Sequence, residues 1–168
     1  LSVSQRQQLD SVVYSSRFAL ALFFGPDVVL DVSWAVRYVS QSESSCIRYI
    51  AVDSRKRNAA APGRGPSLVV HTSVPFGLQH LERDKQDVQP IILEELHKLL
   101  PGLPQPISIK SHKWRFSQVQ SAVPGSPGQM TLHPQPPLVC GGDAFCHSNF
   151  DGCVESALRV FDVLKASL

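Results

Sequence analysis

The sequence has little charge and no strong excess of either sign. Charged residues make up 18% of the 168-residue chain, and its formal net charge is +2. A chain with this composition has no acidic tail, and it is not basic enough to be typical of nucleic-acid-binding proteins. Long hydrophobic runs are also missing, because the longest, Phe18 to Phe24, is much shorter than the roughly 18 to 20 residues that span a bilayer. We therefore expect no nucleic-acid partner and no membrane partner.

Signals of processing and compartment are equally scarce. The chain does not begin with methionine, and no targeting sequence is recognisable at its start. Neither Asn58 nor Asn149 stands in an Asn-x-Ser/Thr sequon, so glycosylation gives no hint of secretion. We expect a piece of a longer protein, and its localisation stays open between cytoplasmic and secreted.

Phosphate-binding motifs are weak. Arg55, Lys56 and Arg57 form a basic run that is more typical of a solvated turn than of a phosphate patch. The segment Gly63-Arg64-Gly65 lacks the third glycine, the preceding βα unit and the downstream acid of a dinucleotide fingerprint. We therefore reject it as a phosphate loop.

The segment CGGDAFCHSNFDGC, residues 140–153, concentrates groups that often bind metals. A structural zinc site usually pairs its ligands two to four residues apart, whereas here the cysteines are widely spaced and Cys146 adjoins His147. A calcium loop beginning at His147 would end on Leu158 instead of a glutamate. We expect no metal, and we also disfavour Cys146 as a catalytic thiol. Buried free thiols are the simplest expectation, although disulfides remain possible.

Hydrophobic patterning predicts an α+β fold. Residues 4–14 and 88–102 have helical spacing, and residues 151–168 form an amphipathic closing helix. β-branched and aromatic runs predict an antiparallel sheet from strands at 17–24, 34–40, 47–54, 67–74 and 107–114. Residues 55–66 read as a flexible hairpin loop, 123–137 as a stretch that cannot pair regularly, and 138–143 as a short strand running into glycines.

This last strand, the glycines and the closing helix together suggest a ligand-binding turn. Gly141 and Gly142 would let a ligand approach the backbone closely, and Asp143 can accept hydrogen bonds from hydroxyl groups. If Asn149 or Asp151 caps the helix, free amides are expected at residues 152–154. A purely structural strand–loop–helix connection explains the same residues.

The motif GGD, followed by SNFDGC-x-x-SA and a terminal helix, resembles the closing flavin-binding motif of the flavoprotein amine oxidase superfamily. The segments LPGLPQP (100–106), HKWRFSQV (112–119), PGQMTL (127–132) and HTSVPFG (71–77) resemble one branch of that superfamily, so the likeness covers essentially the whole chain. The G-x-G-x-x-G unit that begins such enzymes is absent, and the chain therefore resembles only their carboxyl-terminal half.

The resemblance implies two parts. Residues 1–137 correspond to a substrate-binding domain with an antiparallel or mixed sheet and helices. Residues 138–168 correspond to the closing strand, loop and helix of a Rossmann-type FAD-binding domain whose amino-terminal half is missing. That half is the implied partner, and without it we expect an exposed apolar seam.

The resemblance also implies chemistry. The parent would be an FAD-dependent oxidase that converts isomeric dihydro-NAD(P) to NAD(P)+ by hydride transfer to the flavin, with O2 reduced to H2O2. Its partner would be a small-molecule dinucleotide substrate, no protein residue would serve as a catalytic base, and this chain alone is expected to be inactive. The alternatives are an FAD-dependent amine oxidase, or a truncated module that binds or regulates without catalysis.

Particular residues carry these expectations. The implied cofactor-binding residues are Gly141, Gly142, Asp143, Asn149, Phe150, Asp151, Gly152, Cys153 and Val154, and the implied substrate-binding residues are Trp114 and Arg115. Core packing is the simpler explanation for Trp114, and a surface salt bridge for Arg115. His71 is expected to be a satisfied core or edge histidine, and Trp34 and Tyr38 are assigned no role.

Overall fold

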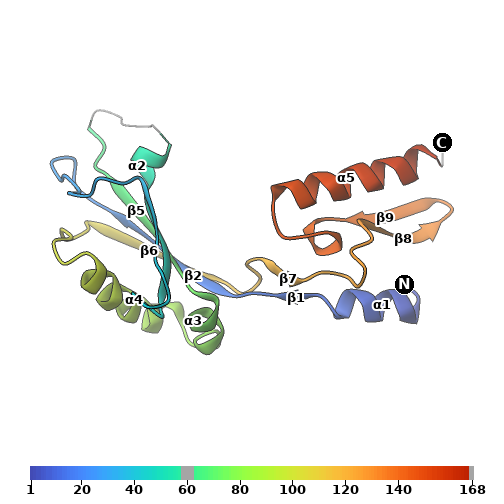
Figure 1. Ribbon diagram of the computed structural model, residues 1–168, viewed down its shortest axis with the longest axis horizontal. Coiled ribbons are helices and arrows are strands. Elements are labelled where there is room, and N and C mark those ends of the chain that lie inside the picture. Colours follow the sequence, from blue (N-terminus) through green and yellow to red (C-terminus); the bar gives the residue numbers. More distant parts are fainter. Residues whose placement is uncertain (58–62, 167–168) are drawn as a thin grey trace. The chain divides into compact units, whose positions relative to one another are not determined.

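The computed structural model describes residues 1–57 and 63–166, and the chain divides into two compact units (Figure 1). One unit, the sheet unit, is Ser16–Arg115. The other, the terminal unit, combines Leu1–Ser15 with Phe116–Leu168. The expected functional boundary between residues 137 and 138 falls inside the terminal unit, and it stays a prediction about function.

The sheet unit is built on a five-stranded sheet whose pairings are all antiparallel. Its strand order is β3 (Val36–Tyr38), β4 (Ile47–Val52), β5 (Ser67–Thr72), β2 (Arg17–Phe23) and β6 (Ser108–Trp114). Side chains alternate between faces along a strand, and β2 follows this rule throughout: Phe18, Leu20 and Leu22 are buried, and the residues between them are partly exposed. One face of the sheet therefore belongs to the core.

Helices cover that buried face. The main one is α4 (Lys85–Leu99), whose amino terminus is capped by the side chain of Asp84. Its residues Val88, Ile92 and Leu96 recur every four positions and join the same hydrophobic cluster as the buried side chains of β2. The short helix α3 (Val74–Gln79) contributes Phe76, and Figure 1 shows α3 and α4 along one side of the sheet.

The terminal unit is smaller. Helix α1 (Val3–Asp10) begins with a capping box made by Ser2 and Gln5, and β1 (Val13–Tyr14) pairs with β7 (Val119–Ser121). A hairpin of β8 (Gln129–Pro134) and β9 (Pro137–Gly141) leads through the 3₁₀ turn η1 (Asp143–Phe145) into α5 (Phe150–Lys165). Val123, Met130 and Phe145 form its core.

Two sequence predictions were wrong in an informative way. Residues 123–137 were expected not to pair, yet β8 pairs with β9, because the prolines flank a run, QMTLH, that contains neither proline nor glycine. The third strand was expected to reach Ser54, but it ends at Val52, and Asp53–Lys56 forms the short helix α2. Part of the expected hairpin loop, residues 58–62, lies outside the described residues.

The other elements differ from prediction only at their ends. The first helix stops at Asp10, and Val13–Tyr14, which was assigned to it, is a strand instead. Helix α4 begins three residues before the predicted position and ends before Pro101. Within the described part of the chain, no helix is long and apolar enough to cross a membrane.

Candidate functional site

The face of the sheet opposite α4, which we call the open face, carries a row of rings. The strand register places Tyr38 beside Tyr49, Tyr49 beside His71, His71 beside Ala19, and Ala19 beside His112. Ring centroids are 5.3 Å apart for Tyr38 and Tyr49, and 5.5 Å apart for Tyr49 and His71. Neighbouring strands are about 4.8 Å apart, so the two imidazoles flank the small Ala19 at about 10 Å.

Trp114 extends this ring row at the edge strand. It lies on the same face, 46% exposed, with its ring centroid 4.3 Å from that of His112. Tyr38 closes the other end and is 77% exposed. Exposed aromatic rings in a row offer flat surfaces for a planar ligand. We refer to Tyr38, Tyr49, His71, His112 and Trp114 as the aromatic row.

The open face is positively charged. Arg17 lies beside Trp114 in the register, and its Nη1 donates to the carbonyl of Thr72 at 2.8 Å. Its Nε is buried and has no hydrogen-bond partner among the described residues. Lys56 Nζ sits 5.6 Å from the centroid of Tyr49. None of the strand positions on this face is Asp or Glu, so strand residues do not neutralise these cations.

These cations act on His71. Burial lowers its pKa from the ordinary 6.5, and the charges of Arg17 and Lys56 lower it further. His71 is therefore a neutral imidazole at neutral pH, able to donate one hydrogen bond and accept another. The structure places His71 partly exposed between Tyr49 and Ala19, and the expectation of a satisfied core or edge histidine stays a prediction.

The two residues expected to bind substrate have different surroundings. Trp114 belongs to the aromatic row, whereas the guanidinium of Arg115 forms a two-fold hydrogen-bonded ion pair with Glu82, with both N–O distances 2.9 Å. This pair is the surface salt bridge weighed as the alternative for Arg115. The sequence reading missed Tyr49, His112 and Arg17, because only the register between strands shows that they share a face with Trp114.

The glycines before α5 have separate roles. A Cβ on Gly141 would lie 2.7 Å from both Ser156 Oγ and Val160 Cγ2, so this glycine permits the close packing of β9 on α5. Gly142 has φ of +137°, and a Cβ there would meet nothing within 4 Å. Of these two glycines, Gly142 is therefore the one whose backbone faces an open space. Asp143, partly exposed, follows it at the start of η1.

The start of α5 corrects the expectation of free amides at residues 152–154. Asn149 is the cap, and its side chain accepts from the amide of Gly152 at 2.7 Å. The amide of Cys153 donates to the carbonyl of Asn149 at 3.2 Å. Among the described residues, the first-turn amides of Phe150 and Asp151 have no hydrogen-bond acceptor, and they carry the positive end of the helix dipole.

The cysteines are free thiols in the structure. Cys146 is buried, and burial raises its pKa, which disfavours the reactive thiolate. The adjacent His147 instead lies 3.7 Å from Glu155. Among the described residues, no group of three or more metal-ligating side chains is arranged to hold an ion.

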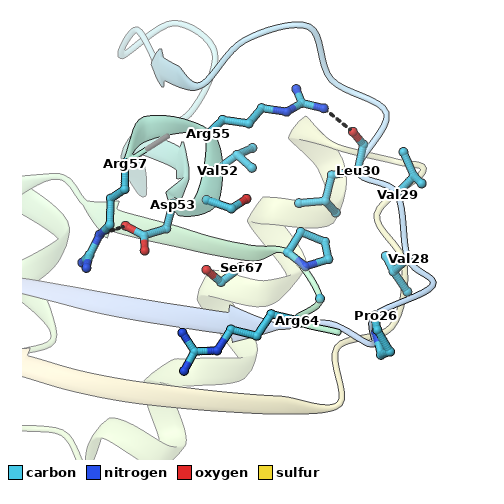
Figure 2. A pocket seen from close by; sticks show the side chains of 13 residues that line it. Pro26, Val28, Val29, Leu30, Val52, Asp53, Arg55, Arg57, Arg64 and Ser67 are labelled. Atoms are coloured by element: carbon cyan, nitrogen blue, oxygen red, sulfur yellow. Dashed lines mark hydrogen bonds and ion pairs between the residues drawn. The ribbon is translucent and has the colours of Figure 1, made fainter. Parts of the chain in front are cut away.

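A cavity of about 370 Å³ lies at one end of the sheet (Figure 2). Three arginines, Arg55, Arg57 and Arg64, line it together with Asp53 and Ser67, and we call it the arginine pocket. Apolar side chains, including Val28 and Leu30, form its opposite wall. Its volume is in the range of pockets that bind small molecules.

Comparison with known proteins assigns the chain to one family. Residues 5–163 match the family described as flavin containing amine oxidoreductase, and the chain therefore belongs to that family. Flavin is the cofactor that this family membership implies.

Within that class, the chain is similar to renalase of Mus musculus, with 53% identity over 165 residues. The match covers 98% of this chain and 48% of renalase, so the chain spans about half the length of that relative. The resemblance inferred from the sequence motifs is thereby confirmed.

Solved structures support the fold alone. A protein from Exiguobacterium, described as a candidate protoporphyrinogen oxidase, has a TM-score of 0.60 and 15% identity over 71% of this chain and 26% of its own. A Pyrococcus furiosus protein has a TM-score of 0.52 and 13% identity over 98% of this chain and 36% of its own.

Proposed function

We propose that this chain is the substrate-binding and flavin-closing part of an FAD-dependent oxidase that converts isomeric dihydro-NAD(P) to NAD(P)+. When bound, FAD would supply the redox chemistry: it would take up the hydride of the dihydropyridine ring, and O2 with one further proton from solvent would receive it as H2O2. Family membership and the similarity to renalase support this proposal. The remaining half, with the FAD pyrophosphate loop, belongs to a longer chain.

The observation that carries the choice of substrate is the cationic open face. A dihydronicotinamide ring is flat and uncharged, and it is attached to anionic phosphates. The aromatic row offers the ring flat surfaces, and Arg17 and Lys56 attract the phosphates. A protonated amine would meet the same cations with no carboxylate on these strands to bind it. The amine oxidase alternative is therefore disfavoured.

Residues of this chain would orient the ring. Trp114 would contact a face or edge of the ring, while the neutral His71, on the other side of Ala19, would hydrogen-bond to a polar substituent. Hydride loss from a dihydropyridine needs no general base, so none of these side chains has to remove a proton. Their task is positioning.

The closing segment fits a flavin through a smaller set of residues than the sequence implied. Gly142 leaves open space beside its backbone, Asp143 follows it, and Phe150 and Asp151 supply the free amides of α5. Asn149, Gly152 and Cys153 would act indirectly, by fixing the first turn of the helix. The roles of Gly141 and Val154 remain proposals of the family resemblance.

The test uses the full-length protein, with its amino-terminal FAD-binding part, loaded with FAD. We expect O2 uptake and equimolar H2O2 with isomeric dihydro-NAD, and no turnover with primary or secondary amines. Trp114→Ala should raise KM for the dinucleotide by about tenfold, since stacking on one aromatic ring is worth about 1 to 3 kcal/mol. Turnover of amines but not of the dinucleotide would reverse the assignment.

A further inference from the structure

The arginine pocket is close to the aromatic row and shares elements with it. Ser67 lines the pocket and lies on the open face of β5, four positions before His71, a spacing of about 13 Å along a strand. Helix α2 is the second link, because it supplies Asp53 and Arg55 to the pocket and Lys56 to the ring of Tyr49. A ligand longer than this spacing can reach both places.

The pocket has an excess of positive charge. Arg57 is neutralised by Asp53 at 3.0 Å. Arg55 is held by backbone carbonyls of the wall, including that of Leu30 at 3.1 Å, and it forms no ion pair within the described part of the chain. Arg64 makes no ion pair with a described residue, and residues 58–62, which lie outside the described residues, carry no charged side chain. Figure 2 shows Arg64 along the pocket edge, facing Ser67.

The lining suits one kind of ligand group. Guanidinium groups bind phosphate oxygens in a forked geometry, and hydroxyl groups such as that of Ser67 donate to the same oxygens. The apolar wall of Val28 and Leu30 gives an aromatic base a surface to lie against. From the sequence we interpreted Arg55-Lys56-Arg57 as a solvated turn. In the structure, Arg55 and Arg57 of this run also line the cavity.

From these observations we infer that the arginine pocket binds the phosphate-bearing adenosine end of the dinucleotide, with Arg64 as the residue that contacts phosphate. The inference rests on the proposed function, because the ring must occupy the aromatic row for the other end to reach the pocket. A dinucleotide has its phosphates and second base several bonds beyond the nicotinamide, and in an extended form it exceeds the spacing between His71 and Ser67.

The experiment compares two substrates of the full-length FAD-loaded protein: isomeric dihydro-NAD, and isomeric dihydronicotinamide riboside, which has the same ring but no phosphate. We expect Arg64→Ala to raise KM for the dinucleotide about tenfold and to leave kcat and the riboside KM unchanged. ADP should inhibit dinucleotide oxidation competitively, and more weakly in Arg64→Ala. Arg83→Ala removes another exposed arginine of the same unit and should change neither KM.

Two failures are distinguishable. If the unaltered protein oxidises neither substrate, the proposed function is wrong, and the assignment of this ligand to the pocket falls with it. If it oxidises both but Arg64→Ala changes the two KM values equally, or changes neither, the function stands and the arginine pocket is not the phosphate site.

Discussion

At the scale of single residues, His71 shows how neighbours set chemistry. The histidine itself is ordinary, but burial, Arg17 and Lys56 all favour its uncharged form. A neutral imidazole can hydrogen-bond to a substrate without repelling the cations around it. The residue's identity is in the sequence, and its protonation state comes from side chains far away along the chain.

This environment can be measured directly. We expect the His71 imidazole to titrate below 6.5 in an NMR titration, and its pKa to rise in Arg17→Met, because removing a nearby cation makes protonation easier. Replacing Arg83, in contrast, should not move it, since that charge is not among those acting on His71. An unchanged pKa in Arg17→Met would mean that burial and Lys56 lower it without Arg17.

Ser156 is a second residue whose role depends on its surroundings in the fold. It is fully buried, and its Oγ accepts from the amide of Gly142 at 2.7 Å and donates to the carbonyl of Gly128 at 2.6 Å. One hydroxyl thus joins α5 to both ends of the β8–β9 hairpin and holds Gly142 in place.

Ser156→Ala should destabilise the terminal unit by about 1 to 3 kcal/mol, because both partners lose a hydrogen bond. Hydrogen exchange at the Gly142 amide is the local readout, and exchange should become faster. Ser45→Ala, at an exposed position, is the control and should leave this amide unchanged. Equal protection of Gly142 in both variants would contradict the bridging role.

At the scale of elements, α4 keeps the sheet unit together. Its buried residues face the buried side chains of β2, and this packing holds the strands whose other face carries the aromatic row. The helix was predictable from its spacing of apolar residues and its late His97 and Lys98. Only the tertiary structure shows which face of the sheet α4 covers.

Replacing Ile92, which is 1% exposed, by alanine should lower the free energy of unfolding by about 2 to 5 kcal/mol through the cavity it leaves. Ile107→Ala makes the same chemical change at a position that is 74% exposed, and it should cost about 0.5 kcal/mol or less. Urea denaturation followed by circular dichroism compares the two. Similar midpoints would show that α4 is not part of the cooperative core.

At the scale of the whole molecule, α5 carries an uncovered apolar face. This apolar stripe recurs along one side of the helix and consists of Phe150, Val154, Leu158, Phe161 and Leu164, between 37% and 81% exposed. A contiguous exposed stripe of this kind usually marks an interface. The expected apolar seam is therefore present, and we propose that the amino-terminal FAD-binding part covers it.

Two measurements test this proposal. The present chain mixed with FAD should show no stoichiometric flavin band in its visible spectrum, whereas the full-length protein should. In the full-length protein, Leu158→Glu should weaken FAD retention, and Leu78→Glu, which alters a similarly exposed leucine on α3, should not. A stoichiometric band with the present chain would show that its glycine turn and α5 suffice to bind the flavin.

The sequence by itself determined the local elements and the family. Apolar periodicity gave α4, α5 and the strands of the sheet, because spacing along a chain decides which side chains share one face of an element. Several motifs in the same order along the chain indicated the family, and recognising them requires no knowledge of the three-dimensional structure. Ends of elements were less accurate, as at the end of α1, and β8 was missed entirely because prolines flank its strand.

Only the tertiary structure decided the site. Tyr49, His71, His112 and Trp114 come from three strands, and the register that aligns them depends on hydrogen bonds between segments distant in sequence. The same holds for the arginine pocket, which Arg64, Arg55 and Leu30 line together from separate parts of the sheet unit. A site whose residues come from several strands and loops depends on how those elements pair. The pattern of residues within one element does not encode that pairing.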